Sequence, residues 1–172
     1  TRDKVISNYK ALQNFRQGKN SLEELTPKSE VSKEEKQQAS VTIYCDGGCT
    51  PNPGEAGSGV AVYRDNELSE LWYGLYETMG TNNTAELGAL YHSLLLAQKE
   101  AQKGNEVEIK CDSMYSINCI KTWAVSWEKK NWTKKGGEIK NLEIIKQAYY
   151  LYNKIKKDVK LLFLKILQIY LF

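Results

Sequence analysis

This sequence of 172 residues has little histidine and no large excess of either charge. His92 is the only histidine, so no other imidazole is present to act as a general acid or base. The 24 Lys and Arg residues nearly balance the 21 Asp and Glu residues, and a net charge of +3 does not by itself argue for a polyanionic partner. The sequence also lacks a run of about twenty apolar residues, which argues against a transmembrane helix.

A secretory signal peptide is also not recognisable, and this bears on the four cysteines, Cys45, Cys49, Cys111 and Cys119. Without such a signal, we expect reduced thiols and a cytoplasmic protein rather than disulfides. A zinc site made from these cysteines would need the spacings C-x3-C and C-x7-C, which are unusual for zinc.

The chain divides into a polar N-terminal extension, residues 1–40, and a domain over residues 41–172. A length of 172 residues suits one domain of about 100 to 150 residues with a short extension. Within the extension, apolar residues recur at helical spacing from Val5 to Leu12, and residues 21–25 have capping-box form, so we expect one or two short helices. The rest of the extension, from Thr26, is almost wholly polar and is expected to be a linker.

From Val41 onward the pattern of apolar residues is that of a mixed α/β domain. Helices are predicted around residues 87–103, from about Ser113, and from Asn141, which would occupy a cap position. The order of strands and helices favours some parallel pairing in the sheet. Strands are predicted over residues 41–45, 58–64, 68–77, 107–111 and 159–165, with a hairpin turn at Asp65 and Asn66 between the second and third.

Three acidic residues are positioned where they could meet. We expect Asp46 and Asp112 to end the first and fourth strands and Glu86 to lie in the first turn of the first long helix. If the two strands are parallel neighbours, their aspartates lie side by side, and the helix could place Glu86 between them. Because three close carboxylates repel one another, the arrangement favours bound cations, and Mg²⁺ is the hard ion that prefers oxygen ligands.

Each acid also has a purely structural interpretation. Asp46 before two glycines could initiate a turn, and Asp112 could cap the helix that follows it. Glu86, three residues after Asn83, could complete a capping box.

The sequence around these acids resembles type 1 ribonuclease H, the endonuclease that cuts the RNA strand of RNA–DNA hybrids. The resemblance covers about residues 41–160 and rests on four motifs in the family's order: DGGCTPNPG, TNNTAEL, CDSMYSINCIKTW and WEKKNW followed by KKGGEIKN. The related transposases and integrases ordinarily present Asp, Asp and Glu, whereas the order here is Asp, Glu and Asp. That order favours ribonuclease H.

This resemblance implies a ribonuclease H-like mixed sheet of five strands flanked by helices, with two Mg²⁺ ions at the carboxylates. One ion would activate the attacking water and the other would stabilise the leaving oxygen of the scissile phosphate. By the family pattern, Asp46 bridges both ions, Glu86 and Asp112 hold one between them, and Gly47 is a further metal contact. The products would carry a 5′-phosphate and a 3′-hydroxyl.

The resemblance also implies how a hybrid is recognised. An enzyme that cuts RNA only in a hybrid must detect 2′-hydroxyls in the shallow minor groove, where exposed backbone N–H groups and small amides fit. Residues that match the family's groove contacts are Gly48, Cys49, Asn52, Asn82 and Asn83, and those that match its pocket for a DNA phosphate are Thr81 and Asn141.

A basic segment from Lys121 to Lys140 resembles the family's protrusion, which grips the DNA strand. It carries six lysines against two glutamates, with three tryptophans among them. An ordinary solvated helix is the alternative, but three exposed tryptophans would be costly. Trp123 is expected to face the hybrid and the other two to brace the protrusion, with phosphate contacts from Lys129, Lys130, Lys134 and Lys135.

His92 is expected to be structural. It lies six residues after Glu86, about 120° around the helix, and therefore points away from the metals.

The resemblance fails after about Lys165, where the family continues into a loop with a histidine and a helix with a fourth metal-binding aspartate. Here no Asp, Glu or His follows Asp158, and eleven of the last fourteen residues are apolar. We therefore expect a domain that is incomplete at its C-terminus, with weakened Mg²⁺-dependent cleavage and partial rescue by Mn²⁺. The alternative is a module that binds hybrids without cutting. A monomer is expected, with some self-association through the apolar tail.

Overall fold

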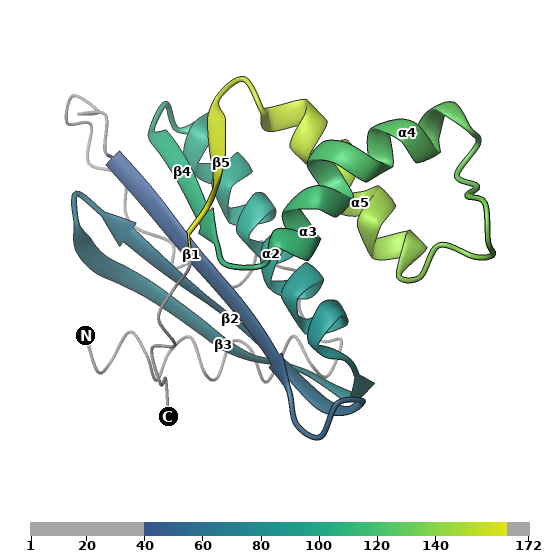
Figure 1. The fold of residues 1–172 in the computed structure, drawn as a ribbon. Helices are drawn as coiled ribbons and strands as arrows, with labels where there is room; N and C mark the ends of the chain where they lie inside the picture. The colour runs from purple at the N-terminus through teal and green to yellow at the C-terminus, as the bar shows by residue number, and fades with distance from the viewer. Residues whose placement is uncertain (1–39, 165–172) are drawn as a thin grey trace, which may run out of the picture.

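A computed structural model describes residues 40–164, and these form a five-stranded mixed sheet in the order β3-β2-β1-β4-β5 (Figure 1). The predicted α/β fold with five strands is confirmed. The predicted helices and linker of the N-terminal extension lie outside the described residues, apart from Ser40, which begins the first strand. In the part of the chain that the structure describes, no helix is long and apolar enough to cross a membrane.

The strands alternate between buried and partly exposed residues, as expected for a sheet covered on one face. β1 pairs antiparallel with β2 and parallel with β4, and β4 pairs parallel with β5. Asp65 and Asn66 both have positive φ and connect β2 to β3, which confirms the predicted hairpin. The strands are β1 (Ser40–Cys49), β2 (Gly54–Arg64), β3 (Glu67–Gly80), β4 (Glu106–Cys111) and β5 (Val159–Phe163).

One long helix crosses the sheet, and a helical group lies beside it (Figure 1). The long helix, α2, begins after the N-cap Thr81 and is followed by Gly104, whose φ of +86° suits glycine. A continuous helical run follows β4, and its last helix and the loop beyond it extend away from the sheet (Figure 1). The helices are α2 (Asn82–Gln102), α3 (Met114–Asn118), the π-helical turn η2 (Cys119–Trp123), α4 (Ala124–Lys129) and α5 (Leu142–Ile155).

The core lies between α2 and the central strands. Its fully buried members include Ile43 of β1, Ile109 of β4 and Leu90 of α2. Leu87, Leu90 and Leu94 share one face of α2 at i, i+3 and i+7, and all are buried, as their spacing predicted. This packing fixes α2 against β1, and thereby sets where the start of the helix meets the strand.

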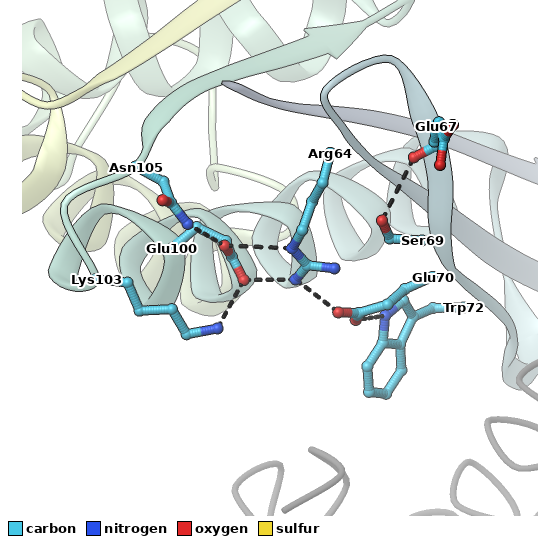
Figure 2. Close-up of polar contacts among 8 residues, drawn as sticks. All are labelled: Arg64, Glu67, Ser69, Glu70, Trp72, Glu100, Lys103 and Asn105. Atoms are coloured by element: carbon cyan, nitrogen blue, oxygen red, sulfur yellow. Dashed lines mark hydrogen bonds and ion pairs between the residues drawn. The ribbon is translucent and has the colours of Figure 1, made fainter. Parts of the chain in front are cut away.

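An ion-pair network around the buried Glu100 joins the far end of α2 to the sheet (Figure 2). Arg64 donates to both Glu70 and Glu100 at 2.7 and 2.6 Å, and Lys103 and Asn105 also donate to Glu100. Burial alone would raise the pKa of Glu100, but these donors lower it to about 2. The carboxylate is therefore held ionised, and it ties β2 to the C-terminal end of α2.

Glu100→Gln should destabilise the fold by about 2 to 3 kcal/mol, because Arg64 loses a buried partner while staying partly hydrated. A carboxyl group whose pKa is lowered by folding stabilises the fold fully above its ordinary pKa of 4.5, and this contribution is lost as the pH falls toward 2. Chemical denaturation at pH 7 and pH 3 should show the difference between wild type and variant shrinking in acid. The exposed Glu67→Gln is the control; an equal difference at both pH values would contradict the assignment.

Candidate active site

The two predicted aspartates leave the parallel strand pair at neighbouring positions. Cys45 of β1 and Cys111 of β4 form the last parallel pair, and Asp46 and Asp112 follow them directly. The prediction that Asp46 ends its strand is wrong, because β1 continues to Cys49 in its antiparallel pairing with β2. Asp112 lies just after β4 rather than within it. The parallel pairing that brings the two residues together is confirmed.

Glu86 is brought to the same edge by the close approach of β1 to α2. An added Cβ at Gly47 would lie 2.3 Å from the Ala85 carbonyl carbon and 2.5 Å from the Glu86 nitrogen, so the strand backbone rests directly on this peptide. On the other side, Ser58 Oγ donates to the Ala85 carbonyl oxygen at 2.5 Å. Glu86 is the fifth residue of α2 and lies just after the first turn. The prediction that it lies in the first turn is therefore wrong.

Gly47→Ala should therefore separate β1 from α2. The new methyl group would overlap the backbone of α2, which cannot move as a flexible side chain would, and we expect a loss of about 2 to 4 kcal/mol in unfolding free energy. Urea denaturation measures this loss. Gly48→Ala is the matched control, since an added Cβ there would meet nothing within 4 Å. Equal stability of the two variants would contradict the close approach.

The structural alternatives for the three acids are not what the structure shows. The capping box of α2 is formed by Thr81 and Thr84, so Glu86 has no part in it. Ser113, not Asp112, caps α3 by accepting from the Ser116 N–H at 3.1 Å. Asp46 lies within a paired strand rather than in a turn, and its Oδ1 accepts from the Gly47 N–H at 2.8 Å.

Asp46, Glu86 and Asp112 form an acidic cluster that has no cationic partner among residues 40–164. Burial, together with the negative charges of Asp46 and Glu86, raises the pKa of Asp112 to about 6. In the described range, no Lys or Arg forms an ion pair with any of the three. Within residues 40–164, no three acidic, His or Cys side chains converge closely enough to hold one ion. Asp46 and Glu86 are nonetheless near enough for their charges to act on Asp112, and carboxylate oxygens are the ligands that a hard divalent cation prefers.

The two loops predicted to contact the minor groove, one around residues 48–52 and the other at residues 82–83, are joined by hydrogen bonds. The Cys49 N–H donates to Asn82 Oδ1 at 2.8 Å, and the Asn82 N–H donates to Asn52 Oδ1 at 3.3 Å. Cys49 is buried, with its Sγ 3.0 Å from the Pro51 carbonyl oxygen, so the expectation of an exposed N–H at this residue is wrong. Gly48, Asn52, Asn82 and Asn83 are exposed. The loops thus have a fixed mutual position, and both amide groups keep their NH₂ groups as donors.

The basic segment projects from the sheet on α4 and the loop after it (Figure 1). Trp123 is 39% exposed and its ring lies 6.0 Å from those of Tyr115 and Trp127. Trp132 is partly buried, and its ring packs edge-on against both Tyr149 and Tyr150, whose rings also contact each other. Trp123 is thus accessible, whereas Trp127 and Trp132 pack against the core. The lysines at 129, 130, 134 and 135 are all exposed.

The predicted phosphate pocket is not assembled by direct contact. Asn141 occupies the N-cap position of α5, as predicted, but its φ of +59° is left-handed and its side chain makes no capping bond. Its Nδ2 instead lies 3.4 Å from Tyr115 Oη, close to Trp123. Thr81 hydrogen-bonds within its own capping box, and no bond among the described residues joins it to Asn141.

His92 lies within α2, and its Nδ1 donates to the Gly88 carbonyl oxygen at 2.8 Å. Burial lowers the pKa of this imidazole, which favours the neutral form. Two contacts near the acidic residues were not predicted: Ser58 Oγ donates to the carbonyl oxygen of Ala85, the residue before Glu86, and Ser113 Oγ donates to the Glu86 carboxylate. A serine directly after Asp112 was a signal for the second, but nothing in the local sequence points to Ser58, which comes from the neighbouring antiparallel strand.

Asp46 and Asp112 directly follow the last parallel pair of β1 and β4, and α2 brings Glu86 near them. This set of carboxylates suits metal-assisted phosphate chemistry and indicates a nuclease of the α/β class. Residues 38–165 match the family RNase H. Ribonuclease H of Pseudomonas putida (strain W619) is 38% identical over 109 residues, which are 63% of this chain and 70% of that protein. The chain belongs to the RNase H family, and the predicted enzyme class is confirmed at that level.

Other relatives agree with this assignment, and solved structures share the fold. Ribonuclease H of Rickettsia typhi (strain ATCC VR-144 / Wilmington) is 37% identical over 63% of this chain and 68% of its own length, and that of Methylorubrum extorquens (strain PA1) is 31% identical over 61% of this chain. The chain spans only 43% of the latter protein. The crystal structure of LC11-RNase H1 in complex with an RNA/DNA hybrid shares the fold with a TM-score of 0.52 and 23% identity, over 73% of this chain and 86% of that one. The solution structure of the PFV RNase H domain has a TM-score of 0.59 and 19% identity, over 76% and 81%.

Proposed function

We propose that this chain is a type 1 ribonuclease H, a metal-dependent endonuclease that hydrolyses the RNA strand of RNA–DNA hybrids. The observation that carries the proposal is the neighbouring placement of Asp46 and Asp112 just after the last parallel pair of β1 and β4, with the Glu86 backbone in close contact with β1. We assign the activity to residues 41–172 and a cytoplasmic location to the protein, whose four cysteines are all free thiols.

In this proposal Asp46, Glu86 and Asp112, with the backbone of Gly47, would supply the ligands for two Mg²⁺ ions. Mg²⁺ bound there would supply a water of lowered pKa and neutralise charge on the scissile phosphate. The residues themselves set the site: β1 and β4 fix the two aspartates, and α2 fixes the glutamate. Because all three are carboxylates, and none is ion-paired in the described part of the chain, they favour binding of a divalent cation over a neutral ligand.

Recognition of the hybrid would use the two hydrogen-bonded loops, around residues 48–52 and at residues 82–83, together with the basic segment. The exposed Gly48, Asn52, Asn82 and Asn83 would contact the minor groove, where a small, rigid polar surface can reach 2′-hydroxyls. Trp123, exposed beside Tyr115 and Asn141, would pack against the DNA strand. The lysines of the basic segment would contact its phosphates.

The test compares one labelled RNA in three states: paired with DNA, paired with RNA, and single-stranded. We expect cleavage of the RNA only in the hybrid, only with Mg²⁺ or Mn²⁺ present, and with 5′-phosphate ends on the products. A gel-shift assay on the same substrates measures binding separately. Binding of the hybrid without cleavage in either metal would overturn the proposed activity and favour a hybrid-binding module.

A further inference from the structure

The Glu86 carboxylate has a hydrogen-bond donor, Ser113, that is not among the predicted site residues. Ser113 Oγ donates to Glu86 Oε2 at 2.5 Å, joining the start of α3 to α2. Ser113 is 5% exposed and Glu86 is half-buried. A hydrogen bond from a buried hydroxyl to a carboxylate is charge-assisted, shorter and stronger than a neutral one.

The backbone of Glu86 is already fixed from two sides. Ser58 Oγ holds the Ala85 carbonyl oxygen, and Gly47 lets β1 lie against the same peptide. These backbone contacts do not restrict rotation of the Glu86 side chain, which has three torsions and a large rotamer entropy. Of the residues that the structure describes, Ser113 is the one that donates a hydrogen bond to this carboxylate.

Ser113 is itself held in place by α3. Its Oγ accepts from the Ser116 N–H at 3.1 Å and lies 3.0 Å from Ser116 Oγ, and Ser116 is fully buried. Because Ser113 directly follows Asp112, the same short segment fixes the direction in which the chain leaves β4. Ser113 thus links the position of Glu86 on α2 to that of Asp112 after β4.

We propose that Ser113 is a positioning residue that orients the Glu86 carboxylate beside Asp112 before a divalent cation binds. The inference rests on the proposed function, since it assigns Ser113 a role in preparing that metal site. Groups that hydrogen-bond to metal ligands in other proteins fix ligand orientation, and their loss typically weakens metal binding about 10- to 100-fold. Ser113 would do this for Glu86 without contacting the metal or the hybrid.

The experiment measures Mg²⁺ affinity by calorimetry on the full chain without nucleic acid, and the Mg²⁺ concentration that gives half-maximal cleavage. Ser113→Ala should weaken both about tenfold, while cleavage at saturating Mg²⁺ recovers most of the wild-type rate. Ser113→Thr keeps the hydroxyl and should restore both values. Ser93→Ala is the control, because it removes a buried hydroxyl that donates within α2 to Ala89 rather than to Glu86.

A double-mutant cycle separates orientation of Glu86 from capping of α3. If Ser113 acts through Glu86, Ser113→Ala should have no further effect on Mg²⁺ affinity in a Glu86→Gln background. A further tenfold loss there, or undiminished affinity in Ser113→Ala alone, would overturn the inference while leaving the proposed function intact. Wild-type protein that binds no Mg²⁺ would overturn both. If Ser113→Ala unfolds, Ser113→Gly, which is tolerated at an N-cap, takes its place in the cycle.

Discussion

Asp46→Asn should reduce hybrid cleavage by about 10³-fold or more while leaving hybrid affinity unchanged or improved. Asp46 is exposed where β1 passes the end of β4, so the substitution removes a charge that would face both metal ions and phosphates. The amide keeps the shape of the side chain and can still accept from the Gly47 N–H through its oxygen. The loss should therefore fall on the chemical step and not on folding.

Single-turnover cleavage and equilibrium binding, measured on one labelled hybrid, separate these two effects. Glu106→Gln is the matched control, because Glu106 is an exposed acid at the opposite end of β4. It should leave both the rate and the affinity within about twofold of wild type. Calorimetry that finds undiminished Mg²⁺ binding by Asp46→Asn would argue against Asp46 as a metal ligand.

The sequence predicted the strands and helices of the domain well because their apolar residues follow strict periods. The alternation in residues 41–45 and the i, i+3, i+7 spacing on α2 both correspond to buried faces. The Asp65–Asn66 hairpin was predictable because few residue pairs tolerate two positive φ angles. The continuation of β1 through Asp46 to Cys49 was not predictable, since two glycines in succession indicate a turn until the pairing partner in β2 is known.

The acidic residues were predictable in kind but not in their surroundings. Their order in the sequence and the parallel strand pairing gave Asp46 and Asp112 neighbouring places. The start of α2 was predicted too close to Glu86. Thr81 and Thr84 form the capping box by hydrogen-bonding to each other, and Glu86 takes no part in it. The contact from Ser58 depends on a neighbouring strand brought near α2 by tertiary packing, and no local pattern in the sequence records that distance.

Replacing Lys129, Lys130, Lys134 and Lys135 together by alanine should weaken hybrid binding about 100-fold at 0.1 M salt, for all sequences alike. All four side chains are exposed, and among residues 40–164 none forms an ion pair, so their charges are available to phosphates. The supporting loop should stay folded, because Trp132 remains packed against both Tyr149 and Tyr150.

The decisive measurement is the dependence of affinity on salt concentration. Each lost phosphate contact should reduce the slope of log K against log salt by roughly 0.7 to 0.9, whereas loss of aromatic packing would lower affinity without changing the slope. The charge-matched control replaces four lysines at the other end of α5 and the start of β5, namely Lys154, Lys156, Lys157 and Lys160. Because β5 runs parallel to β4, its start lies at the sheet edge opposite Asp112, away from the proposed hybrid path. Equal slopes for the two quadruple variants would show that the basic segment contributes only general charge, and the assignment of its lysines to the DNA strand would then fail.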